Sequence, residues 1–260
     1  MPGKRKVRYR PNQNEPFPLS RTSVELYLRC PRCFYLATSE KYDISPPSGP
    51  MSYIPTAIDR ILKSEFNVYR QNQEPHPYLI EREIDAVPFQ HDKIEDWQSI
   101  FKGIRFHHHD TNLILYGAID DCWRHTRSEE LFIVEYKSTT AKKDKKTGQP
   151  INENLDEKGA PWKYWYKKQV EFYQWLFQKN NFTVSNTAYF LFCSALYHGI
   201  SEFNDNLQFK INIVPYQGNN SWIEETIRNI KNVLDSEEIP NSNENCNNCN
   251  YVKKIHREIN

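Results

Sequence analysis

The residues best suited to chemistry stand at the ends of the two most strand-like runs of the chain. Asp120 closes the apolar run LILYGAID, and Glu135 and Lys137 close the run LFIVEYK. Side chains two residues apart on a strand point to the same face, so Glu135 and Lys137 project together while Tyr136 points away. If the runs pair through the turn WRHTRSEE, Asp120 lies beside Glu135. One end of a sheet would then carry two carboxylates and an ammonium group.

Two adjacent carboxylates repel each other unless a cation lies between them. Oxygen ligands suit Mg²⁺ or Mn²⁺, and the backbone carbonyl of Tyr136 offers one more ligand. A lysine beside such an ion can position or deprotonate a water molecule and stabilise the charge of a phosphoryl transition state. This arrangement predicts phosphodiester cleavage. The alternative is an ordinary salt bridge of Lys137 with Glu135 or Asp120.

Four of the six cysteines form two C-x-x-C pairs, CPRC near the N-terminus and CNNC near the C-terminus. A spacing of two residues lets both sulfurs of a pair reach one centre, which predicts a metal or cluster site that joins the two ends of the chain. Disulfides are not expected, because we expect an intracellular, reducing environment. The four residues are Cys30, Cys33, Cys246 and Cys249. Cys122 and Cys193 lie in strand-like runs and are expected in the core.

Hydrophobic periodicity predicts the elements that must position these groups. Helices are expected over 19–38, 54–70, 161–180 and 221–238, with a capping box of Thr22 and Glu25 in the first. The apolar face of the second helix is expected to contain Ile58, Ile61, Leu62, Phe66 and Tyr69. Further strands are expected over 78–89, 186–195 and 208–214, with a short helix over 95–103. This order predicts an α/β fold with one mixed sheet flanked by helices.

The composition sets limits on the function. The chain has 260 residues, 38% of them hydrophobic, and a net charge of +1. A core can therefore form, and the charge balance alone argues neither for nor against nucleic acid. Without a signal peptide or an apolar run of the ~18 residues that a membrane span needs, we expect a soluble, cytoplasmic protein with no membrane partner. No phosphate-binding G-x-x-x-x-G-K-[ST] loop is present, so no helicase motor is expected.

Basic residues gather in two places. Residues 1–18 are expected to form a basic tail that is either solvated or in contact with phosphates. In the second place, the segment 158–168, lysines alternate with aromatic residues, a pattern that suits single-stranded nucleic acid because bases stack on rings. The alternative is that the aromatic residues begin a buried helix face. The candidate binding residues are Lys158, Lys163, Trp165, Lys167 and Lys168.

Three motifs in order carry a family resemblance. Gly117-Ala118-Ile119-Asp120 is followed by Glu135-Tyr136-Lys137 and then by Gln169 and Tyr173 in QVEFYQWL. This pattern resembles that of the PD-(D/E)XK nucleases, in particular the RecB-like branch with the CRISPR-associated adaptation exonucleases. The resemblance implies a restriction-endonuclease-like core and a single domain over 19–260. It also implies that Asp120 and Glu135 hold the metal, that Lys137 orients water, and that Gln169 and Tyr173 contact Lys137 or the scissile phosphate.

The sequence departs from that branch in two respects. Several relatives hold a [4Fe–4S] cluster with one N-terminal and three C-terminal cysteines, whereas the two-and-two arrangement here also fits structural Zn²⁺. The branch often has a metal-binding histidine on an early helix, and Asp59 stands there instead. Asp59 or Glu65 is expected either to ligate the metal or to lie on a solvated face. The histidines in HHHD, residues 107–110, are expected in a surface loop.

The resemblance implies a Mg²⁺- or Mn²⁺-dependent deoxyribonuclease, with exonuclease action the favoured mode. Its substrate would be DNA with single-stranded character. Its setting would be DNA repair, recombination or CRISPR adaptation, with partner proteins from those processes. The alternative is a member of the same fold that binds nucleic acid or scaffolds a complex without cutting.

Overall fold

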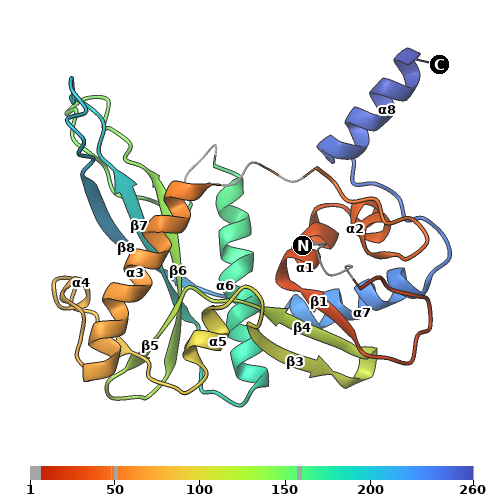
Figure 1. Cartoon of the computed structure of the whole chain (residues 1–260), viewed down its shortest axis with the longest axis horizontal. Coiled ribbons are helices and arrows are strands. Elements are labelled where there is room, and N and C mark those ends of the chain that lie inside the picture. The colour runs from red at the N-terminus through yellow and green to blue at the C-terminus, as the bar shows by residue number, and fades with distance from the viewer. Residues whose placement is uncertain (1–6, 48, 50–51, 157–159, 260) are drawn as a thin grey trace. The chain divides into compact units, whose positions relative to one another are not determined.

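The protein is described by a computed structural model over residues 7–47, 49, 52–156 and 160–259 (Figure 1). The chain divides into two compact units. The terminal unit comprises residues 1–50, 105–117 and 221–260, and the central unit comprises residues 51–104 and 118–220. The expectation of a single domain over 19–260 stays a prediction.

The central unit is built on a five-stranded sheet with the order β2-β5-β6-β7-β8. Its strands are β2 (Ala86–Pro88), β5 (Asp121–His125), β6 (Leu131–Thr140), β7 (Thr187–Ala195) and β8 (Phe209–Gln217). Neighbours are antiparallel except β6 and β7, which run parallel and are connected through helix α6 (Trp162–Lys179). The predicted mixed sheet flanked by helices is therefore confirmed.

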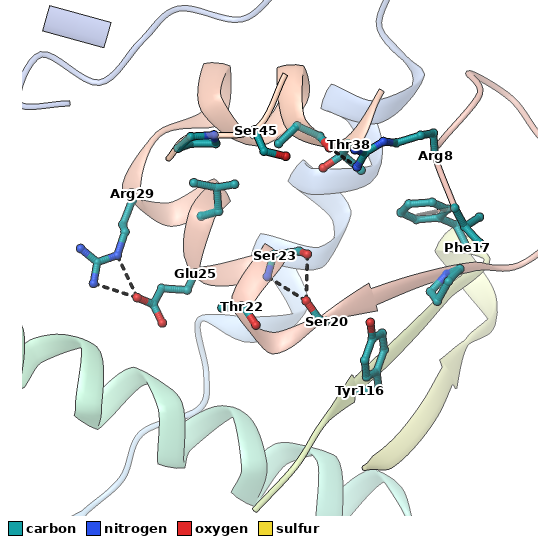
Figure 2. A pocket seen from close by; sticks show the side chains of 15 residues that line it. Arg8, Phe17, Ser20, Thr22, Ser23, Glu25, Arg29, Thr38, Ser45 and Tyr116 are labelled. Carbon is teal, nitrogen blue, oxygen red and sulfur yellow. Dashed lines mark hydrogen bonds and ion pairs between the residues drawn. The ribbon is translucent and has the colours of Figure 1, made fainter. Parts of the chain in front are cut away.

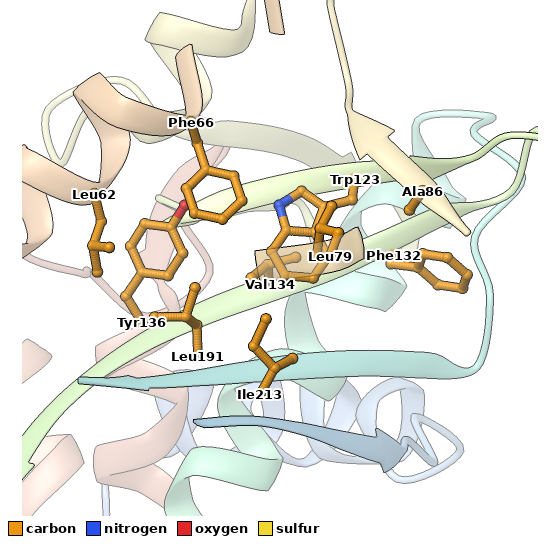
Figure 3. Close-up of a cluster of buried hydrophobic side chains, with 10 residues drawn as sticks. All are labelled: Leu62, Phe66, Leu79, Ala86, Trp123, Phe132, Val134, Tyr136, Leu191 and Ile213. Carbon is orange, nitrogen blue, oxygen red and sulfur yellow. The ribbon is translucent and has the colours of Figure 1, made fainter. Parts of the chain in front are cut away.

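The two faces of this sheet are covered by different helices. Helices α3 (Tyr53–Asn72) and α4 (Pro77–Ile80) contribute Leu62, Phe66 and Leu79 to a core that includes Trp123 and Tyr136 (Figure 3). Alternate residues of β6 point to the opposite face, where α6 buries most of its second half. The strand β6 thus presents Tyr136 to α3, and Glu135 and Lys137 to α6. Helix α5 (Ile94–Gln98) precedes β5 in the chain.

The terminal unit has a three-stranded sheet with the order β1-β4-β3. Its elements are β1 (Phe17–Ser20), α1 (Arg21–Arg29), α2 (Pro31–Thr38), β3 (Ile104–His108), η1 (His109–Thr111), β4 (Leu113–Gly117), α7 (Ile223–Asp235) and α8 (Asn247–Ile259). Helix α7 lies within the helix predicted over 221–238 and buries a stripe of Ile223, Ile227, Ile230 and Leu234. Tyr9 is buried and its backbone bridges Ser39, so this part of the basic N-terminal segment is packed against the unit.

Several predicted elements need correction. The helix expected over 19–38 is broken at Cys30, because Pro31 has no N–H to continue it and instead begins α2. The N-cap of α1 is Ser20, whose hydroxyl accepts from the Ser23 amide, and not Thr22. Within 78–89 only Ala86–Pro88 is a strand, since Pro77 starts a helical turn.

The strand expected over 113–120 was also partly wrong. Leu113–Gly117 is β4 of the terminal unit, and the strand that pairs with β6 is β5, which begins at Asp121. On α3, Ile61 is 64% exposed and so lies off the predicted apolar face. Helix α8 was not predicted. None of its residues is buried, so its sequence has no set of core residues from which a helix could be recognised. No helix in the described part of the chain is long and apolar enough to cross a membrane.

Candidate functional site

Asp120 immediately precedes β5 and is fixed by two hydrogen bonds within the central unit. The register pairs Asp121 with Val134, which places Asp120 next to Glu135. The Tyr136 amide donates to Asp120 Oδ2 at 2.8 Å, and the Gln98 side chain donates to the Asp120 backbone carbonyl at 2.7 Å. One Asp120 oxygen is therefore committed to β6, and the carboxylate has a defined orientation.

Lys137 is held by groups from two elements. Its ammonium lies 2.5 Å from Glu135 Oε1, on the same strand, and 3.2 Å from Gln169 Oε1 on α6. It also lies 4.5 Å from the centre of the Tyr166 ring, a cation–π contact. Gln169 in turn points its amide nitrogen toward the Tyr173 hydroxyl at 3.5 Å. The structure thus brings Glu135, Lys137, Gln169 and Tyr173 together.

A buried ion pair supports this site from the α3 side of the sheet. The guanidinium of Arg70 on α3 pairs with Asp121, and both side chains are almost fully buried. The Tyr136 hydroxyl donates to Asp121 Oδ2 at 2.7 Å, and the Trp123 indole donates to the same oxygen at 3.3 Å. Burial, reinforced by the charge of Asp121, raises the pKa of Tyr136 well above its ordinary value. Sequence reasoning missed Arg70 and Asp121, although an acid within a strand-like run is a signal of a buried pair.

Asp59 is brought to the site, but through a lysine. The ammonium of Lys63, one turn further along α3, lies 3.0 Å from Asp59 Oδ2 and 3.4 Å from Asp120 Oδ1. Burial and the nearby charge of Asp120 raise the pKa of the Asp59 carboxyl. Burial opposes the charge of Lys63, but Asp120 and Asp59 together outweigh it and raise the pKa of its ammonium. Sequence reasoning gave Lys63 no role, although its spacing of four residues from Asp59 is a signal.

Glu65, the other acid proposed on this helix, is not brought to Asp120. Its carboxylate lies 3.1 Å from Nε2 of His76, whose ring stacks on Phe66. His76 is 1% exposed, and burial lowers its pKa. Glu65 therefore contributes to the contact between α3 and the start of α4, and not to the candidate site.

The lysine–aromatic segment is more engaged in ion pairs than its sequence indicates. Lys163 is buried, with its ammonium 2.7 Å from Glu153, and so it is not on the surface that the sequence analysis expected. Lys168 lies 2.9 Å from Glu171, and Lys167 pairs with Asp156. Trp165 is partly buried and meets the Tyr164 ring edge-on. Lys158 lies outside the described residues.

The oxygen atoms of Asp120, Glu135 and the Tyr136 backbone carbonyl are of the kind that bind a hard divalent ion. Tyr136 directs its N–H toward Asp120, and in a strand the N–H and C=O of one residue face the same neighbour, so the Tyr136 carbonyl is directed to that side as well. Two carboxylates, a backbone carbonyl and water are ligands that Mg²⁺ and Mn²⁺ accept. The residues present therefore fit a divalent metal, which Asp120, Glu135 and the Tyr136 carbonyl would hold; this ligand set stays a prediction.

The four predicted cysteines come together in the terminal unit. Cys30 is the N-cap residue of α2 and Cys33 lies in its first turn; Cys246 precedes α8 and Cys249 lies in its first turn. All four sulfurs lie within 4.8 Å of one another. The Cys33 sulfur is 3.5 Å from that of Cys246 and 3.6 Å from that of Cys249, which is 3.8 Å from that of Cys30. In the described residues this is the one group of three or more potential ligands that is so close. The site joins the two ends of the chain, as predicted.

The thiols of this cluster differ in acidity. Burial opposes ionisation of Cys30, but hydrogen bonds from the Cys33 and Asn243 backbones outweigh it and lower its pKa to about 7. Burial raises the pKa of Cys249 to about 11. Metal binding to these thiols is therefore coupled to the release of protons. The other two cysteines, Cys122 and Cys193, are buried in strands as expected.

Two further features of the terminal unit lie outside these sites. His108, expected in a surface loop, is buried at the end of β3 and lies 3.1 Å from the Glu224 carboxylate. A cleft of about 640 Å³ between α1, β1 and the segment after α2 is lined by Arg8, Ser20, Tyr116 and their neighbours (Figure 2). Its arginines are paired, Arg8 with Asp43 and Arg29 with Glu25, so it offers no unpaired guanidinium to an anion.

A comparison with protein families decides the assignment. The family model described as the PD-(D/E)XK nuclease superfamily matches residues 44–253. The chain belongs to the PD-(D/E)XK nuclease superfamily. No curated protein and no solved structure matches it. Membership of this superfamily supports a nuclease-like fold and a nucleic-acid substrate, and its members generally use divalent metals.

Proposed function

We propose that this nuclease-family chain is a Mg²⁺- or Mn²⁺-dependent deoxyribonuclease that cuts DNA from strand ends. The observation that carries the proposal is the position of Lys137, held between Glu135 and Gln169 beside the fixed carboxylate of Asp120. An ordinary cross-strand salt bridge needs neither the second carboxylate nor the glutamine. Three charged groups at one sheet end, supported by a buried ion pair behind them, favour a built site.

Asp120 and Glu135 would hold the ion together with the Tyr136 carbonyl, and the bound ion would supply Lewis-acid stabilisation of the phosphate. Lys137 keeps its ammonium in place through Gln169 and the Tyr166 ring, so it can orient a water molecule or a phosphate oxygen without reorganisation. Tyr173 limits the orientation of Gln169. Gln169 and Tyr173 thus act as positioning residues in this proposal.

Single-stranded character of the substrate is supported by the start of α6. Trp162 and Tyr164 are each about half exposed there, and bases can stack on such rings. Lys167 and Lys168 lie beside them and can exchange their carboxylate partners for phosphates. Lys163 is not included among the proposed nucleic-acid-binding residues, because its side chain is buried. Exonuclease action and a place in DNA repair, recombination or CRISPR adaptation, with protein partners, remain implied by the RecB-like resemblance alone.

For the cysteine site we propose one structural Zn²⁺. Four thiolates at 2.3 Å from a tetrahedral zinc ion have sulfurs about 3.8 Å apart. Three of the six sulfur separations are 3.5–3.8 Å and all six are within 4.8 Å, close to that value. In a [4Fe–4S] cluster each cysteine binds a different iron, and the sulfurs must lie farther apart. The sulfur separations therefore favour zinc over the cluster implied by the resemblance.

The test is cleavage of end-labelled single- and double-stranded DNA with Mg²⁺, Mn²⁺ or EDTA. Wild-type protein is compared with Glu135→Ala and with Glu74→Ala, which removes an exposed acid just after α3. We expect metal-dependent cleavage that is lost in Glu135→Ala and retained in Glu74→Ala, with a product ladder that shows the direction of digestion. DNA binding without cleavage on any substrate would instead support the catalytically silent alternative.

A further inference from the structure

Lys63 occupies an unusual position among the acids of the candidate nuclease site. Its ammonium lies 3.0 Å from Asp59 Oδ2 and 3.4 Å from Asp120 Oδ1, so it bridges carboxylates that are far apart in sequence. The side chain is about a fifth exposed (21%). A mobile surface lysine would not be confined in this way, because two carboxylates from different elements restrict the ammonium to one location.

The two carboxylate oxygens of Asp120 have different partners, and Lys63 contacts only Oδ1. Oδ2 accepts the Tyr136 amide at 2.8 Å, and the main chain is fixed by Gln98. Oδ1 is the oxygen that faces Lys63 and, beyond it, Asp59. The region between Asp59 and Asp120 is thus occupied by an ammonium group.

Two-ion nuclease sites need a different arrangement of acids. Their ions lie about 3.5–4 Å apart, and a carboxylate shared by both must turn its oxygens toward them. Here Oδ2 of Asp120 accepts the Tyr136 amide and Oδ1 faces the ammonium of Lys63. In the described residues the oxygens of Asp59, Asp120 and Glu135 do not all lie within 4.8 Å of one another, so Asp59 does not converge with the other two acids on one ion. Lys63 is the group that stands between two of them.

The net charge of the ionisable groups at the site also favours a single divalent ion. Three carboxylates and the two ammonium groups of Lys63 and Lys137 leave one net negative charge, which one divalent ion already overcompensates. A second ion would meet both the first ion and the ammonium of Lys63 at short range. Like charges at such separations repel strongly where water is partly excluded.

We propose that Lys63 limits this site to one divalent ion by supplying a fixed positive charge where a second ion would bind. The inference rests on the proposed nuclease function. Asp59 is then the counter-ion of Lys63 and not a metal ligand, and Lys63 is a positioning residue for Asp120. An acid at position 59 would ligate a second ion only if the ammonium were removed.

The experiment counts Mn²⁺ ions by titration with electron paramagnetic resonance, in which the signal of the free ion disappears on binding. Site-bound ions are those lost in Glu135→Ala. Wild-type protein and Lys63→Arg are expected to bind one such ion per chain. Lys63→Met is expected to bind two, with the signal of a coupled pair, and the double variant Lys63→Met/Asp59→Asn is expected to return to one.

A second variant keeps the test independent of the stability of Lys63→Met. Asp59→Asn alone should retain the single ion, since Asp59 is not a ligand. Two ions in the wild type, one ion in folded Lys63→Met, or loss of the ion in Asp59→Asn would each overturn the role of Lys63 while the nuclease proposal stands. If the wild type binds no Mn²⁺ that depends on Glu135, the proposed function and this inference both fail.

Discussion

The backbone amide of Tyr136 donates to Oδ2 of Asp120, while the hydroxyl of the same tyrosine donates to Asp121 on the other side of the sheet. Tyr136 therefore holds two consecutive acids, one in the candidate site and one in the core. Asp120 faces the candidate catalytic groups, and Asp121 is sealed in the core with Arg70. The orientation of the half-buried Asp120 is thus linked, through Tyr136, to that of its buried neighbour.

The first prediction concerns that buried pair. Asp121→Ala would leave the Arg70 guanidinium buried without its carboxylate, which typically costs about 3–5 kcal/mol. Urea unfolding should show a loss of this size, whereas Asp92→Ala, at an exposed acid, should change stability by less than about 0.5 kcal/mol. Equal stability of the two variants would mean that the pair contributes nothing to the fold.

The second prediction concerns Lys137. Lys137→Ala removes the ammonium that Glu135, Gln169 and Tyr166 hold in place. Cleavage should fall by about 100-fold or more, while DNA binding stays nearly intact. The matched control is Lys93→Ala, at an exposed lysine before α5. Single-turnover cleavage of labelled DNA measures the effect, and wild-type rates in Lys137→Ala would remove this residue from the mechanism.

The third prediction concerns the cysteine site. Elemental analysis of purified protein should find about one zinc and no iron per chain, without visible charge-transfer absorption. Cys249→Ser should lose the metal and lower the melting temperature, because metal-binding energy is also folding energy. Cys193→Ala should keep the metal, since that thiol is in a strand of the central unit. Iron and sulfide in the wild-type protein would restore the cluster implied by the resemblance.

The sequence predicted which face of β6 carries the candidate site, because strand alternation is a local rule that places Glu135 and Lys137 together and Tyr136 opposite. It also predicted the cysteine site, since C-x-x-C spacing is local as well. The contacts of Lys63 and Gln98 with Asp120 could not be predicted in this way, because they depend on how α3 and α5 pack. The strand that pairs with β6 was misassigned because DCWRH contains Asp121, Arg124 and His125 and so resembles a turn, whereas LILYG is apolar; only tertiary pairing shows that DCWRH is the partner of β6.

The fourth prediction concerns pH and His76. Burial lowers the pKa of His76 in the folded protein below the value of about 6.5 expected in the unfolded chain, so the unfolded state binds a proton more readily. The resulting stability is fully present above about pH 6.5 and is lost as the pH falls from there toward the folded-state pKa.

His76 also caps α4, where its Nδ1 accepts the Tyr78 amide, and asparagine can cap in the same way. In His76→Asn, urea unfolding between pH 7.5 and 5.5 should therefore show a smaller loss of stability than in the wild type. The control is His109→Asn, at an exposed histidine in the terminal unit, which should retain the wild-type slope. The same slope in all three proteins would show that His76 does not set the pH dependence.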